Sequence, residues 1–431
     1  DLHNGRHSFP TRRSSDLVYA GIRLSSRLHE RTLVGALRLP VPAASAVVIS
    51  FGLLIVAGAI LLSLPVASSP ESRSARPVDA LFTAASASCV TGLIVRDTPR
   101  DWSLFGQLVI LLLIQIGGLG TMTMASVLRM FSQRRSTIIE RLVVQDTVAP
   151  GASDVARVVR LIVGFTFLCE SVGALLLAYR WILAGHGVAR SLYEGVFHAI
   201  SAFCNAGFSV FSNNLEDWAA DPIVSLTVCV LIVVGGIGFP VVLDLAHCLR
   251  SRRLGRRVQL TLHSRLALLT TALLIVAGIA LFVVLEWDAA FGNLAPQGKL
   301  LAATFASITP RTAGFDTVAP SKFSLASQWI TMALMFIGAS PGSTGGGVKT
   351  TTLAVLSLLV IGMARGERRV NAMRRSIGEM SRHRAFAIMA MMGSAAFLAT
   401  FTLATTERSD LAKVLYEVLS ALGTVGLSLG I

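Results

Sequence analysis

The chain has 431 residues, of which 53% are hydrophobic and only 14% are charged, and its mean hydropathy is +0.68. A soluble globular domain carries about 25% charged residues, so this composition excludes that class and indicates a polytopic membrane protein. The formal net charge of +14 leaves two explanations, nucleic-acid binding or a membrane topology with basic loops on one side, and the placement of the charges decides between them.

Residues 1–41 precede the apolar part of the chain. Residues 9–17, FPTRRSSDL, resemble the translation of a sequencing-library adapter, and we therefore interpret residues 1–17 as a sequencing or assembly artefact outside the fold. Residues 18–41 are basic and weakly amphipathic, which is typical of a cytoplasmic lead-in to a first membrane span.

From Ala43 on, long apolar runs alternate with short ones. The long runs are each near the ~20 residues that a spanning helix needs, and they lie at 43–64, 104–128, 158–183, 223–245, 266–285, 329–363 with an interruption, and 385–404. Between the runs of each pair lies a segment of roughly 10–14 residues, which is too short to span. A re-entrant helix followed by a loop fits such a segment.

The four short segments are variants of one unit. Each ends in a single glycine followed by Leu or Phe, and these glycines are Gly92, Gly207, Gly314 and Gly426. The intervals from 92 to 207, from 207 to 314 and from 314 to 426 are nearly equal in length, as in a repeat protein. The sequence therefore predicts an all-α membrane protein with four parallel repeats of helix, short helix and helix. The repeats are 42–128, 129–246 with a basic linker, 247–362 with a broken second helix, and 363–431.

The connections between these repeats are rich in arginine. They contain Arg129, Arg134, Arg135, Arg141, Arg157 and Arg160, then Arg250, Arg252, Arg253, Arg256, Arg257 and Arg265, then Arg365, Arg368, Arg369, Arg374, Arg375, Arg382 and Arg384. A repeat of helix, re-entrant segment and helix returns the chain to one side, so all three connections share a side, and the positive-inside rule puts it in the cytoplasm. This topology accounts for the basic charge, and no nucleic-acid partner is predicted.

The short helices should begin with favourable charges and end at the glycine loops. The first begins near Pro77 and Asp79 and ends at Cys89, Glu194 opens the second, the third starts around 297–301, and Asp410 and Glu417 lie in the fourth. Each helix would aim the negative end of its dipole at its loop, which favours a cation. One such loop alone is most simply a tight turn, whereas four at a constant period predict a ring of carbonyl oxygens that replaces the water shell of a cation.

The second long helix of the first three repeats carries a glycine cluster. The clusters are IGGLG at 116–120, VGGIG at 234–238 and GASPGSTGGGVKTTT at 338–352. In the first two, close helix packing is the expected role. The third is composed almost wholly of Gly, Ser, Thr and Pro, so the helix must break inside the membrane, next to protein or water. A gate below the loops fits this position, whereas a phosphate-binding GxxxxGK[ST] motif is excluded because Val348 separates Gly347 from Lys349.

The four loops SASCVTGL, SAFCNAGF, SITPRTAGF and SALGTVGLS, together with the loop ASPGSTGGGVKTTT, resemble the potassium-translocating subunits of the Trk/Ktr/HKT superfamily, closest to the bacterial Ktr type. The resemblance covers about residues 42–431 and implies four repeats in a pseudo-fourfold arrangement around one pore. The implied selectivity filter consists of Cys89, Val90, Thr91, Gly92, Cys204, Asn205, Ala206, Gly207, Arg311, Thr312, Ala313, Gly314, Gly423, Thr424, Val425 and Gly426. The implied gating loop consists of Gly338, Ser340, Gly342, Ser343, Thr344, Gly345, Gly346, Gly347 and Lys349.

The resemblance also implies what the protein works with. It implies potassium at the filter carbonyls, with sodium as a coupling or activating ion, and no covalent cofactor. It further implies a homodimer in the bacterial cell membrane, gated by a cytoplasmic ring of nucleotide-binding regulatory subunits. Within the superfamily, glycine in the first loop goes with potassium selectivity. The five cysteines form no CxxC pair and the eight histidines form no HExxH motif, so the sequence predicts neither a metal site nor a disulfide framework. The spans carry no cluster of His, Asp or Glu, so no enzyme is predicted.

Two charged residues within the apolar part need an explanation. Glu170 lies inside a long run, where an acid is a functional candidate by default or a helix-packing carboxylate with a partner. Lys349 follows the gating loop, where its charge could repel cations in a closed state or extend to the membrane surface.

The end of the chain gives a further expectation. Ile431 lies five residues past Gly426, so we expect the second helix of repeat 4 to be missing. This absence would leave one wall of the pore open to lipid, which spanning proteins avoid.

The sequence therefore predicts potassium uptake through a pore, driven by the membrane potential and without covalent chemistry. The alternative is a secondary transporter of a small solute, with a binding site at the broken helix. That class commonly has two inverted repeats and a charged pocket at the midplane, whereas four parallel repeats with outer loops are predicted here.

Overall fold

The computed structural model describes residues 43–72, 74–132, 152–255, 258–366, 371–372, 375–376 and 378–430. The predicted artefact and lead-in at 1–41 lie outside these ranges. So do several arginines of the connections, namely Arg134, Arg135, Arg141, Arg256, Arg257, Arg368, Arg369 and Arg374. The chain divides into a small part, Asp1–Ser50, and a large part, Phe51–Ile431. All contacts given below lie within the large part.

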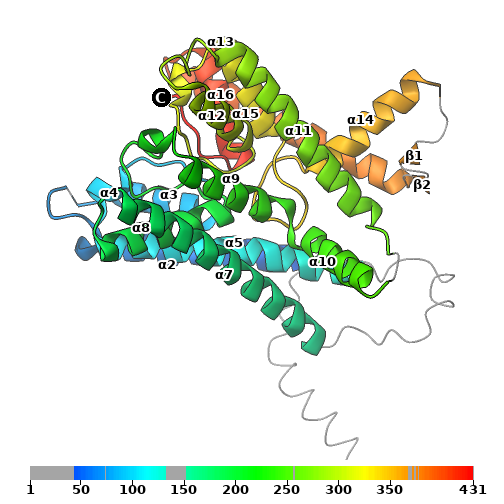
Figure 1. Cartoon of the computed structure of the whole chain (residues 1–431), viewed down its shortest axis with the longest axis horizontal. Helices are drawn as coiled ribbons and strands as arrows, with labels where there is room; N and C mark the ends of the chain where they lie inside the picture. The colour runs from blue at the N-terminus through cyan, green and yellow to red at the C-terminus, as the bar shows by residue number, and fades with distance from the viewer. Residues whose placement is uncertain are drawn as a thin grey trace, which may run out of the picture. The chain divides into compact units, whose positions relative to one another are not determined.

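Every predicted apolar run forms helix (Figure 1). The continuous helices are α2 (Ala43–Leu62), α5 (Leu104–Ser132), α7 (Ala152–Leu183), α11 (Leu262–Glu286) and α15 (Glu379–Thr406). Two runs are divided, into α9 (Pro222–Ile237) with α10 (Phe239–Arg253) and into α13 (Leu325–Phe336) with α14 (Thr350–Ala364). Among the described residues, α5, α7, α11 and α15 are long and apolar enough to span a membrane alone, and α9 with α10 would be a fifth, bent span.

The four predicted short helices are α3 (Pro77–Ser88), α8 (Val188–Cys204), α12 (Pro296–Ile308) and α16 (Leu411–Gly423). Each packs on a long helix of its own predicted repeat: α3 on α5, α8 on α7 and α9, α12 on α11, and α16 on α15. Contacts of α5 with α8, α9 with α12, and α13 with α16 join neighbouring predicted repeats.

The beginnings of two short helices were predicted with different success. In α3, the Asp79 carboxylate accepts a hydrogen bond from the backbone N–H of Arg76 at 3.3 Å, so the predicted start is correct. In α8, the helix begins at Val188, six residues before Glu194, so the prediction that Glu194 opens it is wrong. Glu194 instead lies buried in the second turn, where it forms a hydrogen bond with His186 at 2.9 Å and an ion pair with Arg190 at 2.7 Å. These interactions compensate a carboxylate that would otherwise be buried alone.

The glycine clusters of α5 and α9 differ in their effect. The IGGLG cluster lies in a continuous helix, and a Cβ built on Gly118 would lie 2.6 Å from the Sγ of Cys204, so close packing is confirmed there. The VGGIG cluster ends α9, and the chain bends by 95° between α9 and α10. Gly238 has φ +91° at this bend, which glycine adopts without strain. The predicted close packing also holds in this cluster, because a Cβ built on Gly235 would collide with the carbonyl oxygen of Phe203 in α8. The bend at Gly238 is an additional role that was not predicted.

The remaining described elements are short. They are η1 (Pro65–Ala67), α4 (Thr98–Asp101), η3 (Glu216–Trp218), η4 (Pro320–Lys322), and the two-residue strands β1 (Asn371–Ala372) and β2 (Arg375–Ser376), which pair antiparallel. The strands lie in the third basic connection and are the one departure from the all-α prediction within the described residues.

A buried carboxylate ties the end of α11 to the start of α13. Glu286 is fully buried, and its Oε1 accepts hydrogen bonds from the backbone N–H of Ser324 at 3.0 Å and from the Ser324 hydroxyl at 2.5 Å. Its Oε2 accepts a third from the N–H of Ala290 at 3.2 Å. Since Ser324 is the N-cap residue of α13, Glu286 fixes where that helix begins.

We expect Glu286→Ala to destabilise the protein by about 1–3 kcal/mol, because it leaves buried donors without an acceptor. The measurement is the thermal unfolding midpoint of the detergent-purified protein. Glu379→Ala, at an exposed position in the first turn of α15, is the control and should change the midpoint little. Equal midpoints for the two variants would contradict this role of Glu286.

Candidate functional site

Each short helix ends in one of four loops, which we number 1 (89–92), 2 (204–207), 3 (311–314) and 4 (423–426). In loops 1, 2 and 4 the residue before the glycine donates its N–H to the carbonyl of a serine in the last turn, at 2.7–2.8 Å; these serines are Ser86, Ser201 and Ser420. In loop 3, the N–H of Ala313 bonds instead to the carbonyl of Thr309 at 2.9 Å. The end of each short helix therefore sets the start of its loop.

The four loops share an unusual backbone conformation. Each glycine has a positive φ, between +69° and +94°, and so does the residue two positions before it, between +51° and +77°; these residues are Val90, Asn205, Thr312 and Thr424. A non-glycine residue in this region costs roughly 1–2 kcal/mol, so its presence in all four loops indicates that the surroundings impose it.

The loops meet in a closed ring. A Cβ built on Gly207 would lie 2.8 Å from the carbonyl oxygen of Ala313, and one built on Gly426 would lie 2.5 Å from that of Thr91. The contacts follow the order of the chain, and they are Gly92 with Ala206, Gly207 with Ala313, Gly314 with Val425, and Gly426 with Thr91. Loop 4 thus returns to loop 1, and four carbonyl oxygens of the residues preceding the glycines lie on the ring.

The side chains at the start of loops 2 and 3 contact the surrounding helices. The Sγ of Cys204 faces Glu170 in α7 at 3.9 Å. The guanidinium of Arg311 is buried, and its Nη2 donates to the hydroxyl of Thr271 in α11 at 3.4 Å. One position further on, the side-chain amide of Asn205 lies 3.1 Å from the Oγ1 of Thr312 and so joins loops 2 and 3.

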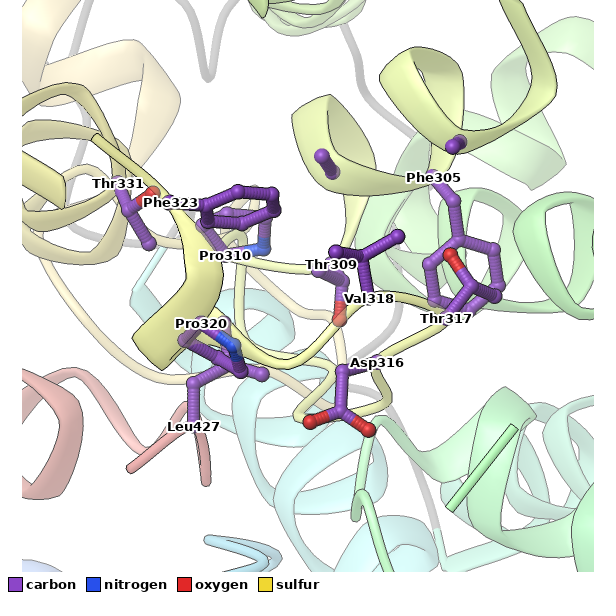
Figure 2. A pocket seen from close by; sticks show the side chains of 12 residues that line it. Phe305, Thr309, Pro310, Asp316, Thr317, Val318, Pro320, Phe323, Thr331 and Leu427 are labelled. Atoms are coloured by element: carbon purple, nitrogen blue, oxygen red, sulfur yellow. The ribbon is translucent and has the colours of Figure 1, made fainter. Parts of the chain in front are cut away.

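Beyond loop 3 the chain carries an acid that the sequence analysis did not select. Figure 2 shows Asp316 at the edge of a small cavity of about 10 Å³, with its carboxylate directed away from the ring of Phe323 and with Leu427, which follows loop 4, nearby. Burial, and to a lesser degree the Glu216 carboxylate, raises the pKa of Asp316 to about 7. The one available signal was its position, two residues after Gly314.

The predicted gating segment forms a loop, 337–349, between α13 and α14. Its two ends are held together, because Gly338 donates its N–H to the carbonyl of Val348 at 2.9 Å. One side of the loop is bonded to the bend after α9: Ser340 donates to the carbonyl of Gly236 at 2.9 Å, and Phe239 donates to that of Gly342 at 3.0 Å. The break in α9 and the break in the third repeat are therefore one connected structure.

The tip of this loop contacts loops 3 and 4 and the last turn of α8, just before loop 2. The N–H of Gly346 donates to the Oγ1 of Thr424 in loop 4 at 3.1 Å. The hydroxyl of Thr344 donates to the carbonyl of Phe203, just before loop 2, at 3.4 Å. Gly345 lies against the Oγ1 of Thr312 in loop 3. The loop therefore lies directly against the ring, on the side of the residues that precede the glycines.

Lys349 forms hydrogen bonds within the loop 337–349. Its Nζ donates hydrogen bonds to the carbonyl oxygens of Gly345 at 2.6 Å and Gly346 at 3.1 Å. Ser340 and Thr350 are joined through their hydroxyls at 2.9 Å, and the hydroxyl of Ser343 bonds to the carbonyl of Ser340 at 2.6 Å. The loop thus has its own internal hydrogen bonds in addition to those with the ring.

The predicted site residues are brought together as two adjacent groups, the ring and the loop beneath it. Two contributors, Thr309 and Asn214, were missed, and the role of a third, Gly238, was not predicted. The hydroxyl of Thr309 bonds to the carbonyl of Phe315 after loop 3, and the amide of Asn214 lies 3.5 Å from the carbonyl of Gly314. Gly238 leaves room for the backbone of Pro341 and Gly342 in the loop 337–349. No pattern in the sequence points to Asn214, which reaches loop 3 from a distant part of the chain.

Comparison with known proteins agrees with this architecture. Residues 39–431 match the TrkH family model, described as cation transport protein. Over 386 residues, the chain is 38% identical to the Ktr system potassium uptake protein B of Bacillus subtilis, covering 89% of this chain and 84% of that protein. It is 35% identical over 387 residues to the potassium/sodium uptake protein NtpJ of Enterococcus hirae, covering 88% and 84%.

A solved structure has the same fold. The crystal structure of the potassium transporter TrkH from Vibrio parahaemolyticus superposes with a TM-score of 0.64 at 17% identity, covering 88% of this chain and 77% of that one. The family model matches nearly the whole sequence, and the two curated relatives match most of it. Together these matches show the family of the chain. The chain belongs to the TrkH family of cation transport proteins.

Proposed function

We propose that this chain is the pore-forming subunit of a potassium uptake system in the bacterial plasma membrane. The observation that carries the proposal is the closed ring of four loops, in which the carbonyl oxygens of Thr91, Ala206, Ala313 and Val425 lie against the neighbouring glycines. Such carbonyl rings replace the hydration shell of a potassium ion. The names of the relatives, potassium and potassium/sodium uptake proteins, support the same ion.

The assignments of individual residues follow from this proposal. Loops 1 to 4 act as the selectivity filter, and the chain from 42 to 431 consists of the four repeats given above. The loop 337–349 acts as the gate, and its contacts with loops 3 and 4 and with the last turn of α8 correspond to a closed state. Uptake needs no chemical fuel, because 100 mV of membrane potential supplies about 2.3 kcal/mol per charge, enough for roughly fiftyfold accumulation of a monovalent cation.

The partners belong to the same proposal. We infer a homodimer, regulated by a cytoplasmic ring of nucleotide-binding subunits, with sodium as a coupling or activating ion. The relatives named as proteins B of a Ktr system support further components. The basic last turn of α10, with Arg250, Arg252 and Arg253, is a candidate docking surface for such a subunit.

The alternative, a secondary transporter with a solute site at the broken helix, has less support. The loop 337–349 bonds to the ring and to the bend after α9, so the protein itself uses hydrogen-bonding groups that a solute would need at the break. Of the residues of this loop only Lys349 is ionisable, and its Nζ is bonded within the loop.

The test is growth at low potassium of a bacterial strain that lacks its own potassium uptake systems. We expect the native full-length protein, expressed with its regulatory partner, to restore growth and the uptake of rubidium, a potassium analogue. A protein that is present in the membrane with its partner and yet leaves growth and rubidium uptake at the level of the empty vector would contradict the proposal.

A further inference from the structure

The middle of α7 carries an acidic side chain that the proposed potassium path does not use. Glu170 is 4% exposed, although only 33% of the apolar window of α7 is buried within the chain. An ionisable group at membrane depth is costly and is retained where it has a specific function. The contacts of Glu170 indicate what that function is.

The carboxyl group of Glu170 connects two other helices. Its Oε2 accepts a hydrogen bond from the Nε2 of Gln115 in α5 at 3.2 Å, and its Oε1 accepts one from the Sγ of Cys204, the last residue of α8, at 3.9 Å. Both donors are neutral, and none of the ion pairs between described residues includes Glu170. Glu170 therefore connects α5 and α8 through hydrogen bonds to neutral groups, without a salt bridge.

The position of Cys204 is fixed from two sides. Glu170 contacts the Sγ from α7, and on the side of α5 a Cβ built on Gly118 would lie 2.6 Å from the same Sγ. The thiol thus occupies space that only a glycine in α5 leaves open. Any shift of the end of α8 must therefore move the sulfur out of the space between Glu170 and Gly118.

Loop 2 begins directly at this point. The next residue, Asn205, turns the chain with φ +61° and joins loop 3 through Thr312. The residue after it, Ala206, supplies the ring carbonyl that lies against Gly92. Only Asn205 therefore separates the residue held by Glu170 from the one that supplies a carbonyl oxygen of the ring.

We propose that Glu170 is a positioning residue for ion selectivity: by holding the end of α8 through Cys204, it keeps the Ala206 carbonyl in its place in the ring. This inference rests on the proposed function of the ring as a potassium filter. A carbonyl ring favours potassium over sodium only while its oxygens keep their number and arrangement. Loss of the bridge is therefore expected to change the ratio of the two ions more than the amount of folded protein.

The experiment compares Glu170→Ala, Glu170→Gln and the control Cys169→Ala in the native full-length protein with its regulatory partner. Initial rates of rubidium and sodium uptake are measured in the same cells and normalised to the protein in the membrane. For Glu170→Ala we expect the rubidium-to-sodium ratio to fall about tenfold, which corresponds to 1.4 kcal/mol. Glu170→Gln should keep the ratio within about twofold, because its amide oxygen can accept from Gln115 while its N–H donates to the sulfur of Cys204, a weak acceptor. Cys169→Ala, which alters the neighbouring residue of α7, should do the same.

A second variant keeps the test decisive if Glu170→Ala does not reach the membrane. Gln115→Ala removes one of the two donors of the bridge and should lower the same ratio in the same direction. An unchanged ratio in the available variant would overturn the positioning role, and so would a Glu170→Gln variant as impaired as Glu170→Ala. The parent protein distinguishes the two proposals. If the parent takes up no rubidium, the proposed function fails. If the parent is active and the variants leave the rubidium-to-sodium ratio unchanged, only the role of Glu170 is overturned.

Discussion

Replacing Gly207 by serine is expected to remove most of the potassium uptake and to make the remainder less selective. The glycine has φ +69°, a conformation that costs a residue with a Cβ roughly 1–2 kcal/mol. The added Cβ would also lie 2.8 Å from the carbonyl oxygen of Ala313 and 2.9 Å from the Cα of Gly314. Both neighbours are backbone atoms of loop 3, so the ring itself has to move.

We expect the initial rate of rubidium uptake to fall at least about tenfold in Gly207→Ser, since even 1.4 kcal/mol corresponds to that factor. Growth at low potassium and the sodium permeability of the same cells are measured in parallel. Gly164→Ser is the matched control, because nothing lies within 4 Å of a Cβ at that position in α7. Wild-type rates and selectivity in Gly207→Ser, at equal protein in the membrane, would rule out the ring as the filter.

Replacing Lys349 by methionine is expected to open the gate in the absence of the regulatory partner. The Nζ holds the carbonyls of Gly345 and Gly346, and hydrogen bonds from a charged donor each contribute about 1.5–3 kcal/mol. Without these two hydrogen bonds, Gly345 and Gly346 are held less firmly against Thr312 and Thr424. The free energy of the closed state then rises relative to that of an open state.

The measurement is rubidium uptake by cells that express the protein without its partner. We expect the rate to rise about tenfold in Lys349→Met, which corresponds to 1.4 kcal/mol. Lys322→Met is the control, because that lysine forms an exposed ion pair with Glu216, of a kind that contributes little. A rate without partner that stays at the parent's level would contradict the role of Lys349 in holding the gate closed.

The sequence predicted the helices and the four loops because both depend on local patterns. Apolar runs of the length that spans a membrane, and glycines at a near-constant period, are visible without any knowledge of contacts. The bend after α9 was not predicted, because IGGLG and VGGIG look alike. The difference lies just beyond the cluster, where Pro240 follows Phe239 and disfavours a continued helix. That signal was available.

Other features could not be read from the sequence. Glu194 is an acid near the start of a short helix, and its place in the second turn depends on the partners His186 and Arg190. The order in which the loops touch, and the reach of Asn214 to Gly314, are set by tertiary packing between distant segments. The pairing of β1 with β2 involves only two residues on each strand, too few for a recognisable alternation.

The contact between Gly426 and loop 1 has a consequence for synthesis of the protein. The two glycines that close the ring, Gly92 and Gly426, are separated by most of the chain. At the usual rate of about 5–20 residues per second, a ribosome needs roughly 17–70 s to make that stretch. Throughout this interval loop 1 lacks the contact with Gly426, and the contacts that hold Val90 at positive φ in the complete fold are not all present. The ring of four loops can therefore be complete only after the fourth loop has been made.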